Sequence, residues 1–265
     1  MSGKRFIWIT CWICFRGFSA GVAENGINPD IPEGDAKGDS MTTYEYGNQE
    51  ASTVLIQPVG EHDLPGMERE AAEIRKLTHM DFRLIAVKVD SWNHDLSPWN
   101  APAVFGKEDF GDGAAKLLEE ILELCTDRSR TYYLGGYSLA GLFSLWAAYQ
   151  TGVFSGVAAA SPSVWFPGFI DYMKQHEIRS RAVCLSLGDR EEKTRNPIMS
   201  TVSDCIREGY AWLNGQGIRC TLEWNPGNHF KEPEFRTAKA FAWVMKSIHF
   251  AQNRNSKTAS YDISP

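Results

Sequence analysis

The chain has 265 residues, of which 43% are hydrophobic, enough to bury one sizeable core, and α/β folds of this length commonly form one domain. Its formal net charge of −6 comes from acidic residues scattered along the chain, and the sequence has no Lys/Arg block of the kind that follows phosphates. These features argue against nucleic acid as a partner.

The first forty residues differ from the rest of the chain. The segment "MSGKRFIWITCWICF" has a basic start and an apolar run of about ten residues, shorter than the roughly 18 that span a bilayer. A polar Gly/Pro/Asp linker without periodicity follows at residues 24–40. We therefore divide the chain into an extension (1–40), a main domain (41–252) and a polar tail (253–265), and expect no stable membrane span.

Two interpretations of this extension remain open. Residues 1–23 act as a signal peptide in the first, and the protein is then secreted. In the second, translation starts at Met41, where the chain moves straight into a strand, and the protein is cytoplasmic. Neither interpretation gives residues 1–40 a role in the chemistry, so a chain that starts at Met41 is expected to be soluble and active.

The six cysteines give little sign of metal or disulfides. Only Cys11 and Cys14 form a close pair, and no second pair or nearby histidine completes a zinc site. The remaining four lie in expected helices and strands and are interpreted as reduced core residues: Cys125, Cys184, Cys205 and Cys220. We expect neither a metal nor an organic cofactor.

From residue 51 onward, strand and helix patterns alternate, which predicts an α/β fold with a mostly parallel central sheet and helices on both faces. Strands are expected at residues 52–59, 82–89, 130–136, 156–162, 181–188 and 218–225, with a further one soon after Met41. Helices are expected at residues 66–79, 111–125, 139–150, 199–214 and 233–250.

The turn between residues 136 and 139 carries the strongest functional signal. In "GGYSLAG", Ser138 stands between a strand and a helix, with small residues on both sides. A sharp strand-to-helix turn needs such neighbours, and it exposes the serine hydroxyl above the sheet as a nucleophile elbow. The amide of Leu139 would then point at a developing oxyanion. Ala140 replaces the second glycine of the common G-x-S-x-G motif.

A serine hydroxyl needs a base and a group that orients the base, and α/β-hydrolases supply them in the order Ser, acid, His. His229 lies in the loop "NPGNHFKEP" between the last strand and the last helix, where this fold presents its base. The other histidines that follow Ser138, His176 and His249, are interpreted as surface residues.

Three carboxylates compete for the role of the acid in the loop "LSLGDREEKTRN". Glu191, three residues after the strand-ending Gly188, is our choice, with Asp189 second. At least two of Asp189, Glu191 and Glu192 are expected to be solvated charges, and the sequence leaves open which of the three is the acid. The acid would hold the imidazole in the correct tautomer and stabilise the imidazolium.

Several motifs resemble an esterase family of α/β-hydrolases that includes the esterase D, enterochelin-esterase and feruloyl-esterase types. They are "GGYSLAGLFSLWAA", "AAASPSVWF", "SLGDREEKT", "NPGNHF" and "WNHDLSPW", and the resemblance extends from about residue 43 to 250. It implies the α/β-hydrolase fold, with Ser138 as nucleophile and His229 as base. The family's Gly-x-x-acid spacing falls on Glu191.

The sequence departs from this family at two places. No arginine precedes the segment "DLSP", so the sequence lacks the arginine that related enzymes often have there and that could bind an anionic substrate. The family's usual His-Gly pair after the early strand is replaced by Gln57 and Pro58, which leaves Val59 or Gly60 as the second oxyanion donor.

Three tryptophans follow expected strands and are candidates for a substrate pocket. Trp92 and Trp99 flank "NHDLSP", and Trp165 follows "ASPS". Ligands of open α/β sheets bind at the carboxyl ends of the strands, so all three are predicted to line the pocket.

The function predicted from these residues is hydrolysis of a small-molecule carboxylic ester through an acyl-enzyme. Two alternatives remain open: acyl transfer to an alcohol on the same fold, and a catalytically silent hydrolase fold that acts as a binding module. The sequence leaves open the acyl and alcohol specificity and the oligomeric state, including a homo-oligomer.

Overall fold

The computed structural model describes residues 41–259, with side chains up to residue 251. The predicted extension, with Cys11 and Cys14, lies outside the described residues, as does the end of the predicted tail at 260–265. Among the described residues, no helix combines the length and the apolar character needed to cross a membrane.

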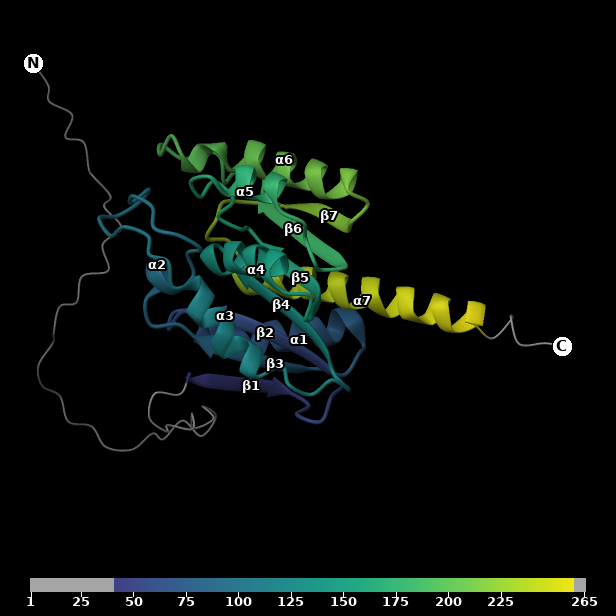
Figure 1. Ribbon diagram of the computed structural model, residues 1–265. Helices are drawn as coiled ribbons and strands as arrows, with labels where there is room; N and C mark the ends of the chain where they lie inside the picture. Colours follow the sequence, from purple (N-terminus) through teal and green to yellow (C-terminus); the bar gives the residue numbers. More distant parts are fainter. Residues whose placement is uncertain (1–40, 260–265) are drawn as a thin grey trace, which may run out of the picture. The chain divides into compact units, whose positions relative to one another are not determined.

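Seven strands form one sheet in the order β1-β3-β2-β4-β5-β6-β7 (Figure 1). They are β1 (Thr43–Gly47), β2 (Thr53–Val59), β3 (Arg83–Lys88), β4 (Thr131–Tyr137), β5 (Phe154–Ala160), β6 (Ala182–Gly188) and β7 (Arg219–Asn225). Strand β1 runs antiparallel to β3, and every other neighbouring pair is parallel. The carboxyl ends of β2 to β7 therefore lie at one edge of the sheet.

The strand order reverses between β2 and β4. The chain passes from β2 through a helix to β3 on one side, and then through two further helices to β4 on the other side of β2. In open α/β sheets, ligands bind at the carboxyl ends of the strands beside such a switch point. The ends of β2 and β4 are thus where this topology favours a binding site.

Helices cover both faces of the sheet, as the sequence predicts. They are α1 (Met67–Thr78), α2 (Trp92–Asp95), α3 (Ala114–Glu123), α4 (Leu139–Gln150), α5 (Phe169–Gln175), α6 (Val202–Gly215) and α7 (Pro233–Ala259), with short 3₁₀ turns η1 (Leu64–Gly66) and η2 (Met199–Thr201). One hydrophobic core lies under α1 and α7. The other lies under α3, α4, α5 and α6.

Helix α4 is buried along almost its whole length, because every residue from Leu139 to Tyr149 is buried. A helix that is apolar on all sides needs neighbours all round, and α4 packs mainly on β4 and β5. Its first residue directly follows Ser138, so a rigid element fixes the turn that carries this serine.

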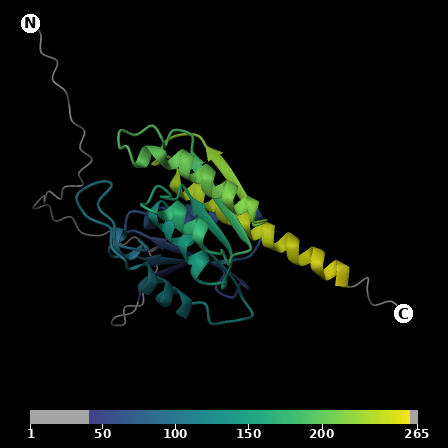
Figure 2. The same ribbon diagram turned by 45° about the horizontal axis from the view of Figure 1, so that its top comes forward.

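Most predicted elements are confirmed to within two residues, but the last helix is longer than predicted. Helix α7 ends at Ala259 rather than at residue 250, so part of the predicted tail is helical. In two views, its C-terminal part extends beyond the sheet (Figures 1 and 2). The four cysteines of the described residues are free, and Cys184 is buried while the others are partly buried.

Candidate active site

Ser138 occupies the sharp turn between β4 and α4. Its backbone has φ 59° and ψ −121°, a region that residues with a side chain rarely adopt and that costs on the order of 1–3 kcal/mol. Two backbone hydrogen bonds hold the turn, from the Ser138 amide to the Ala160 carbonyl at 3.1 Å and from the Ser163 amide to the Ser138 carbonyl at 3.1 Å. The surrounding loops therefore maintain the strained turn.

Small residues make this turn sterically feasible. A Cβ atom at Gly136 would lie 2.6 Å from the Cβ of Ala140, and one at Gly141 would lie 3.0 Å from the Gly136 carbonyl oxygen. The helix start and the strand end approach each other too closely for larger side chains. This contact explains the "GYSLAG" pattern and the tolerance of alanine at position 140.

His229 meets the Ser138 hydroxyl from the loop after β7. Its Nε2 lies 3.0 Å from the Ser138 Oγ, and its Nδ1 lies 2.7 Å from Oε2 of Glu191. Because a carboxylate can only accept, Nδ1 carries a proton, and Nε2 of the neutral ring is left to accept from the serine. The structure thus brings together all three residues that the sequence selected.

Glu191 is buried and held by several donors. Its side chain is 4% exposed, and its Oε1 accepts from the Gly188 amide at 2.7 Å, from the Ser161 hydroxyl at 2.7 Å and from Arg236 at 2.8 Å. Burial alone would raise the pKa of this carboxyl. The hydrogen bond and charge of His229, with the bonds from Ser161 and Gly188, outweigh burial and hold the pKa below its ordinary value.

The other two candidate acids lie elsewhere. The Asp189 carboxylate accepts from the Gly227 amide at 2.8 Å, so it ties the Glu191 loop to the loop that carries His229. Glu192 is exposed. A Cβ atom at Gly188 would lie 2.8 Å from Oε1 of Glu191, so only glycine lets the backbone approach this carboxylate closely.

Arg236 is a central residue that the sequence interpretation missed. It lies in the first turn of α7 with a side chain 3% exposed. Its guanidinium donates to Glu191, to the Tyr137 hydroxyl at 3.0 Å and to the Asn228 carbonyl at 2.9 Å. Tyr137 in turn donates to the His229 carbonyl at 2.6 Å. One buried cation therefore joins the strand before Ser138 to the loops that carry Glu191 and His229.

Two further serines after β5 approach the same centre. Ser163 is buried, and its Oγ lies 3.4 Å from the Ser138 Oγ. Ser161, at φ 43°, donates to Glu191 and accepts from Arg236. The two serines of the motif "ASPS" therefore contact two members of the site: Ser163 lies beside Ser138, and Ser161 is hydrogen-bonded to Glu191.

The two predicted oxyanion donors lie at neighbouring strand ends. Leu139 is the first residue of α4, and the first N–H groups of a helix have no acceptor within the helix. Val59 is the last residue of β2 and is buried, with its carbonyl accepting from the Val89 amide. The amide of Gly60, the alternative, donates to the Asp63 carboxylate at 2.9 Å. The role of Val59 or Gly60 as second donor stays a prediction.

The three tryptophans have different surroundings. Trp92 lines a cavity at the ends of β2 and β4. Trp99 packs against Phe166 and donates from its indole nitrogen to the Pro167 carbonyl, while Trp165 is buried against Phe110. The contacts of Trp99 and Trp165 are those of packing residues, so their place in a substrate pocket stays a prediction.

Comparisons with solved structures identify the fold. The chain is 18% identical to the siderophore hydrolase EstA from Aspergillus nidulans over 87% of this chain and 99% of that one, with a TM-score of 0.57. It is 14% identical to the siderophore hydrolase EstB of the same organism over 76% and 88% of the two chains, with a TM-score of 0.57. The chain has the α/β-hydrolase fold.

A third similar structure is the enterochelin esterase from Shigella flexneri, at 16% identity and a TM-score of 0.56. The match covers 79% of this chain but only 55% of that one. No protein-family model matches the sequence, and a search of curated proteins finds no significant match. The resemblance inferred from the motifs is therefore confirmed at the level of the fold.

In this fold, the hydroxyl of Ser138 faces a base that a buried carboxylate orients. Such an arrangement can activate an oxygen nucleophile at neutral pH without a metal. Within residues 41–259, no cluster of three or more His, Cys, Asp or Glu side chains is arranged to hold a metal ion.

Proposed function

We propose that this protein is a serine hydrolase that cleaves carboxylic esters through an acyl-enzyme. The observation that carries the proposal is the continuous hydrogen-bonded chain from Ser138 through His229 to the buried Glu191. The strained backbone of Ser138 supports it, because strain of this kind persists where the surroundings enforce it and clusters at active sites. The fold shared with hydrolases that cleave siderophores and enterochelin supports it further.

The proposed reaction has two steps. His229 takes the proton of the Ser138 hydroxyl as its oxygen attacks the ester carbonyl, and the protonated imidazole then donates that proton to the departing alcohol. Water, activated by His229, next attacks the acyl-serine and releases the acid. The amides of Leu139 and Val59 stabilise the oxyanion of each tetrahedral intermediate, and Glu191 stabilises the imidazolium.

A panel of esters tests the proposal. Wild-type protein is assayed on short-chain, medium-chain and aryl-acyl esters and on a siderophore-type trilactone, beside Ser138→Ala. We expect hydrolysis of at least one ester class and, in the variant, a loss of up to about a millionfold in kcat, as in serine enzymes that lose their nucleophile. The variant should remain folded and unfold close to the temperature of the wild type, since alanine removes only the hydroxyl of a partly buried residue.

Two outcomes would contradict the proposal. A folded Ser138→Ala variant that retains a rate within about tenfold of the wild type would remove Ser138 from the mechanism. A wild-type protein that hydrolyses none of these esters would favour the alternative of a silent hydrolase fold that binds a ligand.

A further inference from the structure

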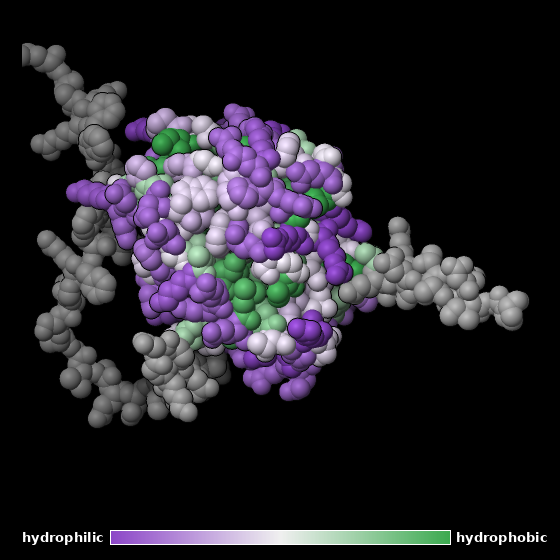
Figure 3. All heavy atoms as spheres, viewed as in Figure 1, coloured by the Kyte–Doolittle hydropathy of each residue, from purple (hydrophilic) through white to green (hydrophobic). Residues whose placement is uncertain are grey.

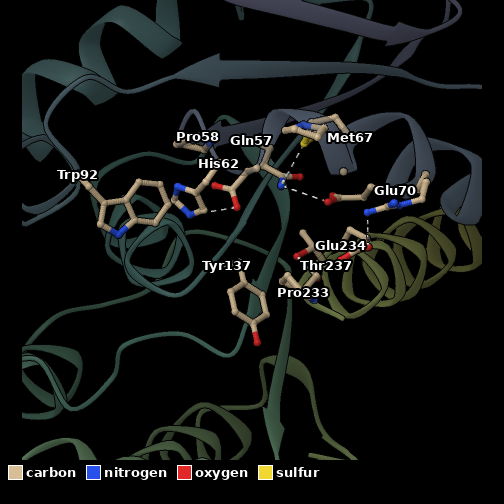
Figure 4. Close-up of a pocket in the computed structure, with 14 residues that line it drawn as sticks. Gln57, Pro58, His62, Met67, Glu70, Trp92, Tyr137, Pro233, Glu234 and Thr237 are labelled. Atoms are coloured by element: carbon tan, nitrogen blue, oxygen red, sulfur yellow. Dashed lines mark hydrogen bonds and ion pairs between the residues drawn. The ribbon is translucent and has the colours of Figure 1, made fainter. Parts of the chain in front are cut away.

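A small cavity lies beside the nucleophile elbow, at the ends of β2 and β4 (Figure 4). Its volume is about 130 Å³, close to that of engineered cavities that hold one benzene molecule. Gln57 and Pro58 of β2 line it, and Tyr137, the residue before Ser138, contributes its ring. The strand order reverses between these two strands, so the cavity occupies the place where this fold class binds ligands.

Two buried polar side chains, Gln57 and Glu70, line this cavity, and each has one buried oxygen without a partner. Gln57 is 4% exposed and Glu70 is 2% exposed. The Gln57 amide donates to Oε2 of Glu70 at 3.4 Å and lies 3.9 Å from the sulfur of Met67 (Figure 4). Gln57 Oε1 and Glu70 Oε1 have no hydrogen-bond partner. A buried acceptor without a donor is unfavourable, so the pair favours a ligand that supplies N–H groups.

The charges around the cavity favour a cation. Asp63, Glu70 and Glu234 contribute carboxylates to the lining. The guanidinium of Arg69 is bound to Glu234 at 2.9 Å, and Nε2 of His62 lies 3.4 Å from Asp63.

Among the described residues, Glu70 makes no ion pair. The indole of Trp92 lies at the same cavity beside His62, and an aromatic face attracts a cation (Figure 4).

We propose that this cavity binds a primary ammonium group, with Glu70 and Gln57 as its acceptors and Trp92 at its edge. An ammonium ion has three N–H donors and a charge, so it meets both unpartnered oxygens and the uncompensated carboxylate. Together with the proposed esterase function, on which this step rests, such a cavity selects esters that carry an amino group in the acyl or the alcohol part. Its place beside Tyr137 allows one molecule to reach both the cavity and Ser138.

Burial of Glu70 predicts how this binding depends on pH. Burial raises the pKa of the Glu70 carboxyl well above its ordinary value, the carboxylates of Asp63 and Glu234 add to the increase, and the hydrogen bond from Gln57 opposes it. A bound ammonium ion favours the ionised carboxylate and so lowers this pKa. Cation affinity therefore rises with pH through the interval between the bound and the free pKa of Glu70, where binding releases a proton.

Calorimetric titration with two small probes tests the site without any catalysis. The probes are n-butylammonium and 1-butanol, which have the same chain length and differ in charge and in the number of donors. Wild type is compared with Glu70→Gln and with Glu68→Gln, an exposed glutamate of the same helix that does not line the cavity. Thermal unfolding establishes that each variant is folded.

We expect wild type and Glu68→Gln to bind butylammonium at least about tenfold more tightly than butanol, a difference of about 1.4 kcal/mol. Glu70→Gln should remove that preference. In wild type the affinity for butylammonium should rise as the pH rises above about 4.5, the ordinary pKa of a glutamate, and in Glu70→Gln it should not change. Equal affinities in wild type, a preference that survives Glu70→Gln, or a flat pH dependence in wild type would overturn the proposal.

A kinetic comparison assigns the substrate class separately. Ethyl 6-aminohexanoate is compared with ethyl heptanoate, and 4-aminobutyl acetate with pentyl acetate. At least one amino ester should exceed its neutral partner about tenfold in kcat/KM, and Glu70→Gln should abolish the difference. Butylammonium binding without hydrolysis of any ester would refute the esterase function and leave the ammonium site standing, whereas hydrolysis without butylammonium binding would refute the site alone.

Discussion

The side chain of Glu191 makes more hydrogen bonds than the side chain of either other member of the proposed triad. One of its oxygens faces His229, and the other accepts from three donors, so its position is fixed before any substrate binds. Asp189, two residues earlier, instead accepts from a backbone amide of the neighbouring loop. Two carboxylates in one loop thus have different tasks, one electrostatic and one that holds the loops together.

The Glu191 arrangement gives a prediction for neighbouring carboxylates. Glu191→Gln should lower kcat about a thousandfold or more, because it removes the charge that stabilises the imidazolium. Asp189→Asn and Glu192→Gln should change kcat by less than about tenfold. Initial rates on the best ester of the panel measure all three variants. The largest loss in Asp189→Asn would transfer the role to Asp189, and three near-neutral variants would indicate a Ser138 and His229 dyad.

The sequence allowed Ser138, His229 and Glu191 to be chosen because each follows a recognisable strand, and parallel strands end at one edge. It could not predict Arg236. An arginine in the first turn of an amphipathic helix is usually exposed, and the burial of Arg236 depends on the loops of His229 and Glu191 closing over it. The role of Arg236 depends on tertiary contacts, so no local sequence pattern indicates it.

At the scale of elements, α7 does more than cover a face of the sheet. Its first turn holds Arg236 against β4 and the two loops, and its middle packs into the core shared with α1. The sequence predicted the start of this helix correctly but ended it too early. Apolar periodicity stops where the helix passes beyond the sheet, although no Gly or Pro ends it.

Two other helices, α2 and α5, were also missed. They have four and seven residues. Such segments are too short for apolar periodicity to reveal them, and tertiary contacts rather than propensity stabilise short helices.

The links made by α7 predict that Arg236 is a positioning residue. Arg236→Met should lower kcat about a hundredfold with little change in KM, because a shift of about 1 Å in a catalytic group costs on that order. Arg236→Lys keeps the charge but not the set of donors and should recover part of the rate. The control is Arg207→Met, which removes an arginine that lies over the Trp224 ring, on a different helix.

The split between kcat and KM decides this point. A rise in KM at constant kcat would mean that Arg236 contacts substrate. Unchanged kinetics with only a lower melting temperature would mean that its role is purely structural.

At the scale of the whole molecule, one sheet edge holds two buried glutamates with opposite pKa shifts. The Glu191 pKa is held below its ordinary value, whereas burial raises the Glu70 pKa well above it. Their contributions to stability therefore depend on pH in opposite directions. In the view of Figure 3, the most evident group of hydrophobic residues lies near the middle of a largely hydrophilic face.

Stability should respond to these two groups in opposite ways. A carboxyl whose pKa is lower in the folded than in the unfolded protein stabilises the folded state at pH values above the unfolded pKa of about 4.5. This stabilisation is lost as the pH falls through the pKa of the folded state. Wild type should therefore exceed Glu191→Gln in free energy of unfolding by about 3–5 kcal/mol at pH 7, where the variant also leaves Arg236 unpaired, and by less below pH 4.5.

The pKa of Glu70 is higher in the folded than in the unfolded protein, so Glu70 increasingly destabilises the folded state as the pH rises above about 4.5. Glu70→Gln should be more stable than wild type at pH 7, and the difference should shrink toward pH 4. Urea unfolding at several pH values measures both pairs. A difference between wild type and either variant that does not change with pH would contradict the ionisation states assigned here.

The central claim is that Ser138 is a nucleophile activated by His229, and covalent labelling tests it most directly. Wild type, Ser138→Ala and His229→Gln are incubated with a fluorophosphonate near neutral pH, and the modified peptide is identified by mass spectrometry. The account predicts one adduct, on Ser138 of the wild type, no adduct in Ser138→Ala, and labelling at least about a hundredfold slower in His229→Gln. No adduct in the wild type, or an adduct on another residue, would contradict the account.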